Sequence, residues 1–423
     1  MTTLSKSVDA LVVGAGPVGL ITALGLARAG LSVEIIDCAW RSAAQSYACG
    51  LHASTLNLLA SVGMDQSIGE ASSVVENVAF YEGADRRAEL HLRDPGATQP
   101  YLSVIPQDHL EELLENGLRE LGIRVHWGCR LADLQIGTDS VSATIEKLVL
   151  TSVGYPFARS EEMVQSDARM EARYVVGADG SSSHVRQVLG IESQLCGSPW
   201  TYEIIEFDSL TPPVREVRIT VGPGTADVFW PQHGTTCRWS LEIPGAHDTD
   251  PDHPIKERRS IVLLDDEPDA RARASLTDRL RLRAPWFDAG IREIDWTTQV
   301  TFTPMVAKEF GRDRCWLAGD AGHQTSPIGM QSMNVGLREG LDLAARIASV
   351  LRDGKSSSTF DEYNRERQLE WSTLLGRGDK ISSLPGSNAW VRNHRKRFLN
   401  WLPGSGSDLT AYLNQLGLAL TTA

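Results

Sequence analysis

The residue types best suited to chemistry begin in a glycine-rich stretch near the start of the sequence. Residues 14–19 read Gly-Ala-Gly-Pro-Val-Gly and match the pattern GxGxxG. In such a loop Gly14 permits a tight turn, Gly16 lets a pyrophosphate approach the backbone, and Gly19 lets a helix pack against a strand. Asp37 ends the next apolar run, where a carboxylate can accept hydrogen bonds from a ribose diol. The contacts predicted for a dinucleotide are Gly14, Gly16, Pro17, Val18, Gly19 and Asp37.

Two motifs further along the sequence bear on the choice between NAD and FAD, which the first loop leaves open. Asp179-Gly180 ends one apolar run, and Gly319-Asp320 ends another. A helix that begins at about Gly329 would direct free N–H groups and the positive end of its dipole at a bound anion. The predicted cofactor contacts of this segment are Gly329, Met330, Gln331, Ser332, Met333 and Asn334, with the side chains of Gln331 and Asn334 as added donors.

These motifs need strands and helices to hold them at one place. The alternation of an apolar run, the glycine loop, a helical pattern and a second apolar run over residues 8–37 predicts a βαβ unit. Residues 107–121 predict an amphipathic helix, and 334–351 predict a long one. From 202 to 243 the hydrophobic period is closer to two, which predicts a mostly antiparallel sheet in a second domain.

Composition excludes several classes of protein. The chain has 423 residues and a formal net charge of −13, which disfavours nucleic acid as a partner. No uninterrupted apolar stretch of about 18 residues is present, so we expect neither a transmembrane helix nor a membrane partner. The polar N-terminus lacks the features of a signal peptide and predicts a cytoplasmic protein. The six cysteines are scattered without CxxC spacing, so we expect free thiols and no metal site.

Taken together, the three motifs resemble those of class A flavoprotein monooxygenases of the p-hydroxybenzoate hydroxylase type, which carry them in this order and at similar spacings. The resemblance covers roughly residues 8–370 and implies FAD as the cofactor. It implies that Asp320 holds the ribityl chain and that Gln107 contacts the flavin side. It also implies that Asp179 and Gly180 lie near the FAD and take part in binding a pyridine nucleotide.

The fold expected from the patterns and the resemblance is α/β. It combines a Rossmann-like FAD-binding domain with an inserted, mostly antiparallel β-sheet domain for the substrate and a C-terminal helical segment. The predicted boundaries are 1–77, 100–195 and 296–355 for the discontinuous FAD-binding domain, 78–99 and 196–295 for the substrate domain, and 356–423 for the C-terminal helical region.

The sequence departs from the family pattern in two places. The usual Gly-Gln-Gly is replaced here, so that Met330 and Ser332 stand at two glycine positions around Gln331. The family often has an arginine just before Ala-x-Gly-Leu, close to the flavin, whereas this chain has Tyr47 there. Arg41 is the nearest basic alternative, and we include it among the cofactor contacts.

The resemblance also implies a reaction. NADPH or NADH reduces FAD, molecular oxygen forms a flavin C4a-hydroperoxide, and its distal oxygen passes to a small electron-rich aromatic substrate. A base that deprotonates a phenol would assist the transfer. The candidate bases are His52, His233 and Tyr202, among which the sequence does not choose. Tyr47 and Pro327 are expected beside the flavin, and Tyr47 is also a candidate for ordinary packing.

The strand predicted at 237–243 offers one possible wall for an aromatic substrate. Its apolar residues alternate with polar ones, so Trp239 lies on an apolar face. Two interpretations of Trp239 are open. Either this face lines the substrate pocket, or Trp239 is core beneath the helices of its own domain.

Three other functions stay open beside hydroxylation. A flavin-dependent reductase of the same fold would share the three motifs. A flavin-dependent halogenase is disfavoured because no lysine lies between Lys6 and Lys147, the region where a halogenase needs one. A non-enzymatic FAD-binding regulator would bind the cofactor without turnover.

Overall fold

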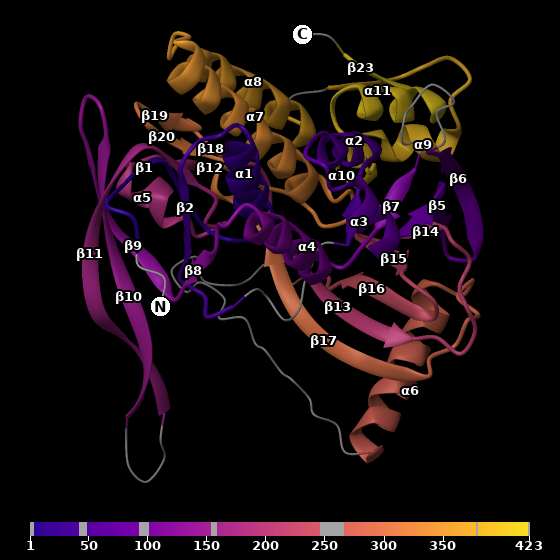
Figure 1. Cartoon of the computed structure of the whole chain (residues 1–423). Coiled ribbons are helices and arrows are strands. Elements are labelled where there is room, and N and C mark those ends of the chain that lie inside the picture. Colours follow the sequence, from indigo (N-terminus) through magenta and orange to yellow (C-terminus); the bar gives the residue numbers. More distant parts are fainter. Residues whose placement is uncertain are drawn as a thin grey trace.

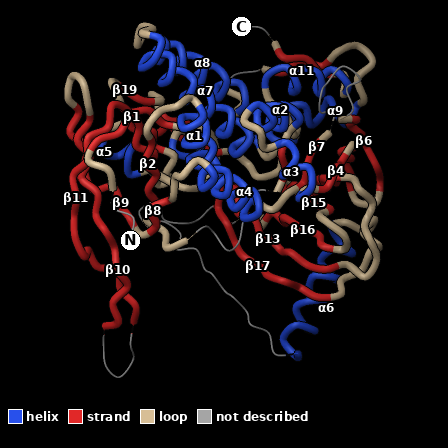
Figure 2. Tube along the Cα trace, in the orientation of Figure 1, coloured by secondary structure: helices blue, strands red, loops and turns tan. Residues whose placement is uncertain are grey.

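The computed structural model describes residues 4–41, 49–92, 101–153, 159–245, 266–377 and 380–421. Tyr47 lies outside these ranges. Two large sheets stand apart, with most of the long helices between them, and α6 lies on the far side of the second sheet (Figures 1 and 2). The mixed α/β fold class is confirmed. Among the described residues, no helix combines the length and the apolar character needed to cross a membrane.

The first large sheet brings the three motifs to one edge. It has eight strands, and its path runs β19-β20-β11-β1-β2-β8, with β10 and β9 added beside β11. Val13 at the end of β1 pairs in parallel with Gly177 on β11 and Ile36 on β2. The carboxyl ends of these strands therefore meet. The strands are β1 (Ser7–Val13), β2 (Val33–Asp37), β8 (Val125–Trp127), β9 (Cys129–Ile136), β10 (Val141–Val153), β11 (Arg159–Gly177), β19 (Gly311–Arg312) and β20 (Cys315–Leu317).

Helices cover this sheet because its central strand is apolar on both faces. On β1, Ala10 and Val12 pack towards the long helices, whereas Leu11 and Val13 pack towards β9, β10 and the short α5. Helix α1 lies against both α4 and α7. The predicted βαβ unit and the predicted amphipathic and long helices are confirmed. The helices of this half are α1 (Pro17–Arg28), α2 (Ala53–Ser61), α3 (Asp65–Ala71), α4 (Gln107–Glu120), α5 (His184–Val188), η1 (Gly319–Ala321), α7 (Gln331–Asp353) and α8 (Thr359–Leu374).

The second large sheet has seven strands in the order β17-β13-β16-β15-β14-β5-β6. All neighbours are antiparallel except β14 and β5, which run parallel. Its outer face is covered by α6 (Asp266–Arg283), as Figure 1 shows. The strands are β5 (Asn77–Glu82), β6 (Asp85–His91), β13 (Trp200–Asp208), β14 (Val217–Gly222), β15 (Thr225–Pro231), β16 (Thr236–Glu242) and β17 (Glu293–Phe302).

The C-terminal segment packs against β6 of the second sheet and against α8. Phe398 and Trp401 of the C-terminal segment are buried, and the Phe398 ring lies 5.0 Å from the ring of Phe80 on β5. The remaining elements are β3 (Gly50–Leu51), β4 (Ser73–Val75), β7 (Leu102–Val104), β12 (Ser193–Leu195), β18 (Met305–Ala307), β21 (His323–Gln324), β22 (Ile381–Ser383), α9 (Ala389–His394), η2 (Arg395–Arg397), α10 (Phe398–Trp401), α11 (Gly406–Gln415) and β23 (Leu418–Leu420).

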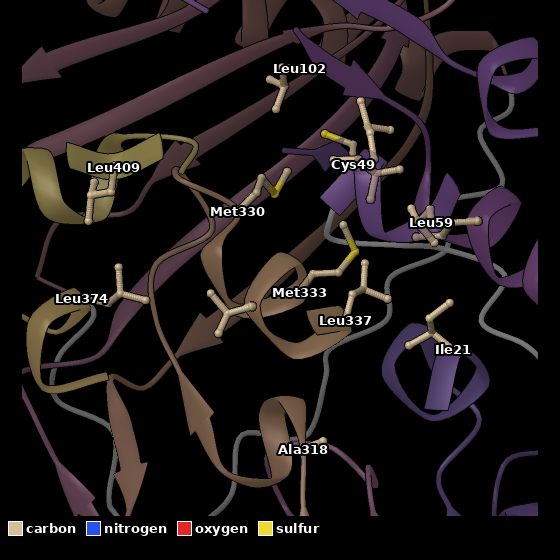
Figure 3. Close-up of a cluster of buried hydrophobic side chains, with 14 of the residues drawn as sticks. Ile21, Cys49, Leu59, Leu102, Ala318, Met330, Met333, Leu337, Leu374 and Leu409 are labelled. Atoms are coloured by element: carbon tan, nitrogen blue, oxygen red, sulfur yellow. The ribbon is translucent and has the colours of Figure 1, made fainter. Parts of the chain in front are cut away.

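One continuous core joins the helices to the inner face of the second sheet. It includes Cys49 before β3, Met330 and Met333 at the start of α7, and Leu409 of the C-terminal segment, drawn together in Figure 3. Trp230 of β15 belongs to the same core. The inner face of the second sheet is therefore the one that faces the helices of the first sheet.

Trp239 lies on the outer face of that sheet, and this corrects the idea that its strand face lines a pocket. Its ring is fully buried among residues of α6 and the segment that follows. Alternation along a strand shows that two faces differ, but it does not show which face a second domain covers. The partners of Trp239 in this outer cluster are Phe229, Leu276, Leu280, Trp286 and Phe287.

We expect Trp239→Ala to destabilise the protein by about 3–5 kcal/mol, because truncating a buried tryptophan leaves a cavity. Thermal unfolding checks this. Leu282→Ala is the control, since Leu282 on α6 is 84% exposed and a surface change of this kind shifts stability by about 0.5 kcal/mol or less. A Trp239→Ala variant that melts normally but binds substrate poorly would contradict this assignment and indicate that Trp239 lines the substrate pocket.

Candidate active site

A cavity of about 720 Å³ lies where the carboxyl ends of β1, β2 and β11 meet. All three motifs contribute to its wall. The residues predicted from the sequence that line it are Gly14, Gly16, Pro17, Val18, Asp37, Gln107, Asp179, Gly180, Asp320, Pro327, Met330, Ser332 and Met333. The described residues that were predicted for the site but do not line this cavity are Gly19, Arg41, His52, Tyr202, His233, Trp239, Gly319, Gly329, Gln331 and Asn334.

The glycines of the first loop have different physical tasks. Gly14 has a φ of +103°, and a Cβ there would lie 2.2 Å from the carbonyl oxygen of Ala178. A Cβ on Gly19 would lie 1.9 Å from the carbonyl oxygen of Gly14. Around Gly16, in contrast, nothing lies within 4 Å of a Cβ position. Gly14 and Gly19 thus serve packing inside the protein, whereas Gly16 leaves open space in the cavity wall.

The positive end of α1 faces this open space. Helix α1 begins at Pro17, and no side chain caps its N-terminus. Its first N–H groups are therefore available to an anion. Asp37 stands beside them and accepts hydrogen bonds from the N–H groups of Ala15 and Ala39, each at 2.7 Å. A carboxylate has further acceptor capacity, so Asp37 can fix the loop and still accept from a ribose hydroxyl.

The Asp-Gly motif is held by its own short helix. Asp179 accepts hydrogen bonds from the N–H groups of His184 and Val185 at 2.7 and 3.0 Å, and from the hydroxyl of Ser183. Its carboxylate thus caps the start of α5. Sequence reasoning gave Arg186 no role, yet Arg186 donates to the carbonyl oxygen of Ala321 at 2.7 Å and so ties this motif to the Gly-Asp motif.

The Gly-Asp motif rests on a buried acid that sequence reasoning missed. Glu339 on α7 accepts hydrogen bonds from the N–H of Gly319 at 2.8 Å, from His323 Nε2 at 2.9 Å and from Trp371 Nε1 at 3.0 Å. Burial acts to raise the pKa of Glu339, but the facing His323 holds it below its ordinary value. Burial raises the pKa of Asp320, while His323 opposes that effect. The glutamate therefore anchors the loop that presents Asp320 to the cavity.

The start of α7 differs from the prediction in what its side chains contact. Gln331 Nε2 donates to the carbonyl oxygen of Leu399 at 2.6 Å, and Asn334 Nδ2 donates to that of Gly50 at 2.8 Å. We predicted that the side-chain amides of Gln331 and Asn334 donate to a ligand. This is wrong for the structure described here, because both amides donate to backbone carbonyl oxygens of the protein. Gly329 likewise meets protein, since a Cβ there would lie 2.7 Å from the carbonyl oxygen of Leu402.

Met330 carries the conformation that the family pattern would give to a glycine. Its φ is +53°, and among the described residues only Asp313 shares a positive φ without being glycine. Left-handed backbone is costly for a residue with a side chain. Met330 nevertheless caps α7 and lines the cavity. The surrounding contacts of Gln331 and Asn334 hold it there.

The candidate bases are placed away from the first cavity. His52 is buried, and its Nε2 lies 2.8 Å from the carbonyl oxygen of Gly329. Burial lowers the pKa of His52 to about 4. Burial raises the pKa of Tyr202 well above its ordinary value, so the phenol stays protonated. His233 is exposed in the turn between β15 and β16 and lines a second, smaller cavity.

The N-terminal turn of α4 stands between the two cavities. Gln107 lines the first, and its Nε2 donates to Glu111 Oε1 at 2.8 Å. Asp108 and His109 line the second. The second cavity is bounded on its other side by the inner face of β13 and β16.

The chain is similar in sequence to a known family and to known monooxygenases. A family model described as FAD binding domain matches residues 7–375. The chain is 25% identical over 366 residues to a 12-dehydrotetracycline 5-monooxygenase/anhydrotetracycline 6-monooxygenase of Streptomyces rimosus, covering 85% of this chain and 66% of that one. It is also 25% identical over 376 residues to a para-nitrophenol 4-monooxygenase of a Pseudomonas strain, covering 85% and 82%.

A solved structure shares the fold. The p-nitrophenol 4-monooxygenase from Pseudomonas putida superposes with a TM-score of 0.68 at 19% identity, covering 96% of this chain and 94% of that one. In length, the chain spans just under two thirds of the tetracycline enzyme.

We expect the free energy of unfolding to fall by about 3 kcal/mol as pH drops from 6.5 to 4, because His52 must stay neutral in the folded protein. The folded pKa is the lower one, so the stabilisation is present above pH 6.5 and is lost below it. Chemical denaturation across this pH range measures the effect. His52→Gln, whose amide can still donate to Gly329, should flatten the curve, and an unchanged slope would contradict the assignment to His52.

Proposed function

The chain belongs to the FAD binding domain family, and from this premise we propose that it is an FAD-dependent, NAD(P)H-consuming monooxygenase that hydroxylates an electron-rich aromatic small molecule. The convergence of the three motifs on one cavity carries the proposal. The relatives named as tetracycline and para-nitrophenol monooxygenases support it.

The cavity fits FAD by its open wall at Gly16, where a Cβ would meet nothing within 4 Å. The first turn of α1 and Gly16 would hold the pyrophosphate, Asp37 a ribose, and Asp320 the ribityl chain. When bound, FAD supplies the redox chemistry and the activation of oxygen. The protein's own residues would bind and orient the cofactor and exclude water from it.

Exclusion of water is assigned to the end of the cavity near α7. Phe302, Pro327, Met330 and Met333 line it there. These side chains carry no charge, so they lower the local water content and strengthen the electrostatic effect of the α7 N-terminus. No protein nucleophile is required. His52 is assigned as a positioning residue for Gly329 rather than as the base.

Finer parts of the proposal concern organisation. The domain spanning 1–77, 100–195 and 296–355 is proposed as Rossmann-like, with 78–99 and 196–295 as the substrate domain and 356–423 as the C-terminal region. The boundary at 295/296 needs to move, because β17 (Glu293–Phe302) crosses it and belongs as a whole to the second sheet. The partners are NADPH or NADH, molecular oxygen and a small aromatic substrate. We propose a cytoplasmic location, which the six free cysteines support.

Gly16→Asp should fold normally but bind FAD about a hundredfold more weakly or worse, because a carboxylate beside the pyrophosphate costs roughly 3 kcal/mol. Titration of apoprotein with FAD, followed by fluorescence, measures the loss. Gly69→Asp is the matched control: Gly69 lies in α3, and nothing lies within 4 Å of its Cβ position. Equal FAD affinity in the two variants would place the pyrophosphate elsewhere.

With a true substrate, NAD(P)H oxidation should accelerate and the product should gain one oxygen atom from labelled oxygen gas. A panel of para-nitrophenol, naphthols and tetracycline-type polycyclic phenols, analysed by product mass, tests this. Reduced product without label would instead support the reductase, and halide incorporation the halogenase. Tight FAD binding with no NAD(P)H oxidation across the panel would support a regulator.

A further inference from the structure

The hairpin of β10 and β11 extends beyond the strands that hold its base. Strand β9 pairs with β10 only as far as Lys147, and β1 pairs with β11 only from Glu171 onwards. Beyond them, residues 149–153 of β10 pair with residues 159–163 of β11 and with no other strand among the described residues. We call this two-stranded stretch the arm. It projects from the body of the protein at the lower left of Figure 1.

The arm has no hydrophobic core of its own. Leu150 is 55% exposed and Met163 is 50% exposed, and Val164 at the base of the arm is 47% exposed. Val149 pairs with Met163, so these two residues share one face of the ribbon and Leu150 lies on the other. A two-stranded ribbon is marginally stable by itself in water. A third strand added at an edge would supply the contacts that the arm lacks.

The outer edge of β10 is open to such a strand. The N–H of Leu148 donates to the carbonyl oxygen of Gly128 at 2.8 Å, the last bond that the described residues make on this edge. Alternate residues of a strand turn their backbone N–H and C=O groups to the same edge. The backbone groups of Leu150 and Ser152 therefore face outwards, and they have no partner among the described residues.

This edge also lacks the features by which natural proteins prevent pairing between sheets. Residues 149–153 read Val-Leu-Thr-Ser-Val and contain no proline, no lysine and no other charged residue. The nearest lysine along the strand, Lys147, donates to the carbonyl oxygen of Trp127 at 2.6 Å and so does not guard the edge. Valine and threonine favour the extended conformation that a new strand pair requires.

The distribution of charge favours a second copy of the chain as the partner. The formal net charge is −13, so two copies repel each other wherever broad surfaces approach. An uncharged edge on a projecting arm allows contact while the charged bodies stay apart, and salt screens charges separated by more than about 8 Å. The strand on the other side of the arm, β11, carries charged residues such as Glu162. The β10 edge is therefore the one suited to self-association.

We propose that the arm is a dimerisation element, in which the outer edge of β10 pairs antiparallel with the same edge of a second copy about a two-fold axis at Thr151. In this register Leu150 lies opposite Ser152 of the second copy, and the two residues exchange both backbone hydrogen bonds. The two Thr151 residues form the non-hydrogen-bonded pair on the axis, and no charged residues face each other.

The size of the contact sets its strength. A five-residue edge is small beside the roughly 1,600 Å² that a standard protein interface buries. We therefore expect a dimer that dissociates at micromolar concentrations and is in equilibrium with the monomer. Sedimentation velocity on the FAD-bound protein over roughly 1–100 μM measures this equilibrium.

Thr151→Cys tests the position of the axis. The two residues of a non-hydrogen-bonded antiparallel pair have Cα atoms about 4.5 Å apart, within the range that a disulfide spans. Oxidation of the FAD-bound variant with copper phenanthroline should therefore produce a covalent dimer on a non-reducing gel. Gln165→Cys is the matched control, because Gln165 is exposed on the β11 side. It should remain largely monomeric, as should the wild-type protein, in which Cys38 is exposed.

Thr151→Lys tests whether the edge carries the association. It places two like charges directly opposite each other on the axis, which should raise the dimer dissociation constant about tenfold or more. Gln165→Lys adds the same charge on the β11 side and should leave the dissociation constant unchanged. Thr151 is half-buried and Gln165 is exposed, so thermal unfolding should show both variants to be folded.

A wild-type protein that stays monomeric over the whole concentration range would overturn the proposal, and the arm would then take a strand from another protein or none. A dimer that persists in Thr151→Lys, without a crosslink in Thr151→Cys, would assign the association to another face. A larger loss in Gln165→Lys than in Thr151→Lys would assign it to the β11 edge. If Thr151→Lys does not fold, the Thr151→Cys crosslink decides, and its absence overturns the proposed register.

Discussion

The arrangement of the candidate site depends on one buried carboxylate. Glu339 lies inside the protein and accepts hydrogen bonds from Gly319, His323 and Trp371. Burying a carboxylate is costly unless donors surround it, and here three donors from separate elements do so. The His323 ring is in turn stacked 3.7 Å from Trp371. Helix α7, the Gly-Asp loop and α8 are therefore locked together at the point where Asp320 reaches the cavity.

The parallel pairing of strands fixes the positions of the three motifs across the first large sheet. The ends of β1, β11 and β20 lie in register, with Val13 beside Gly177 and Gly177 beside Leu317. Motifs separated by well over a hundred positions in the sequence thus leave the sheet at one edge. Arg186 then fixes the distance between the second and third motifs through the carbonyl oxygen of Ala321. Residues that contact no ligand set much of the shape of the cavity.

Elements that depend on local sequence pattern could be predicted from the sequence. Side-chain orientations that depend on a residue distant in the sequence could not. The glycine loop, the first βαβ unit and α4 follow from spacing and periodicity, and each is confirmed. The orientation of Gln331 does not follow, because its acceptor is the carbonyl oxygen of Leu399, supplied by a segment distant in the sequence. The face of Trp239 could not be assigned for a similar reason. Glu339 was missed because a lone glutamate on an amphipathic helix is usually exposed; its signal was a position on the apolar stripe of α7.

The first turn of α7 shows how such distant partners bear on function. Gln331 binds the C-terminal segment on one side, and Asn334 binds Gly50 on the other. Between them Met330 is held at a φ of +53°, a conformation that needs support from its surroundings. The dipole of α7 can act on a flavin only if this turn keeps its direction. The C-terminal segment thus belongs to the site through the backbone it supplies, although none of its described residues lines the first cavity. Gln331 Nε2 also donates to the carbonyl oxygen of Gly404 at 3.3 Å, so we expect changes at Leu399 or Gly404 to shift the first turn of α7.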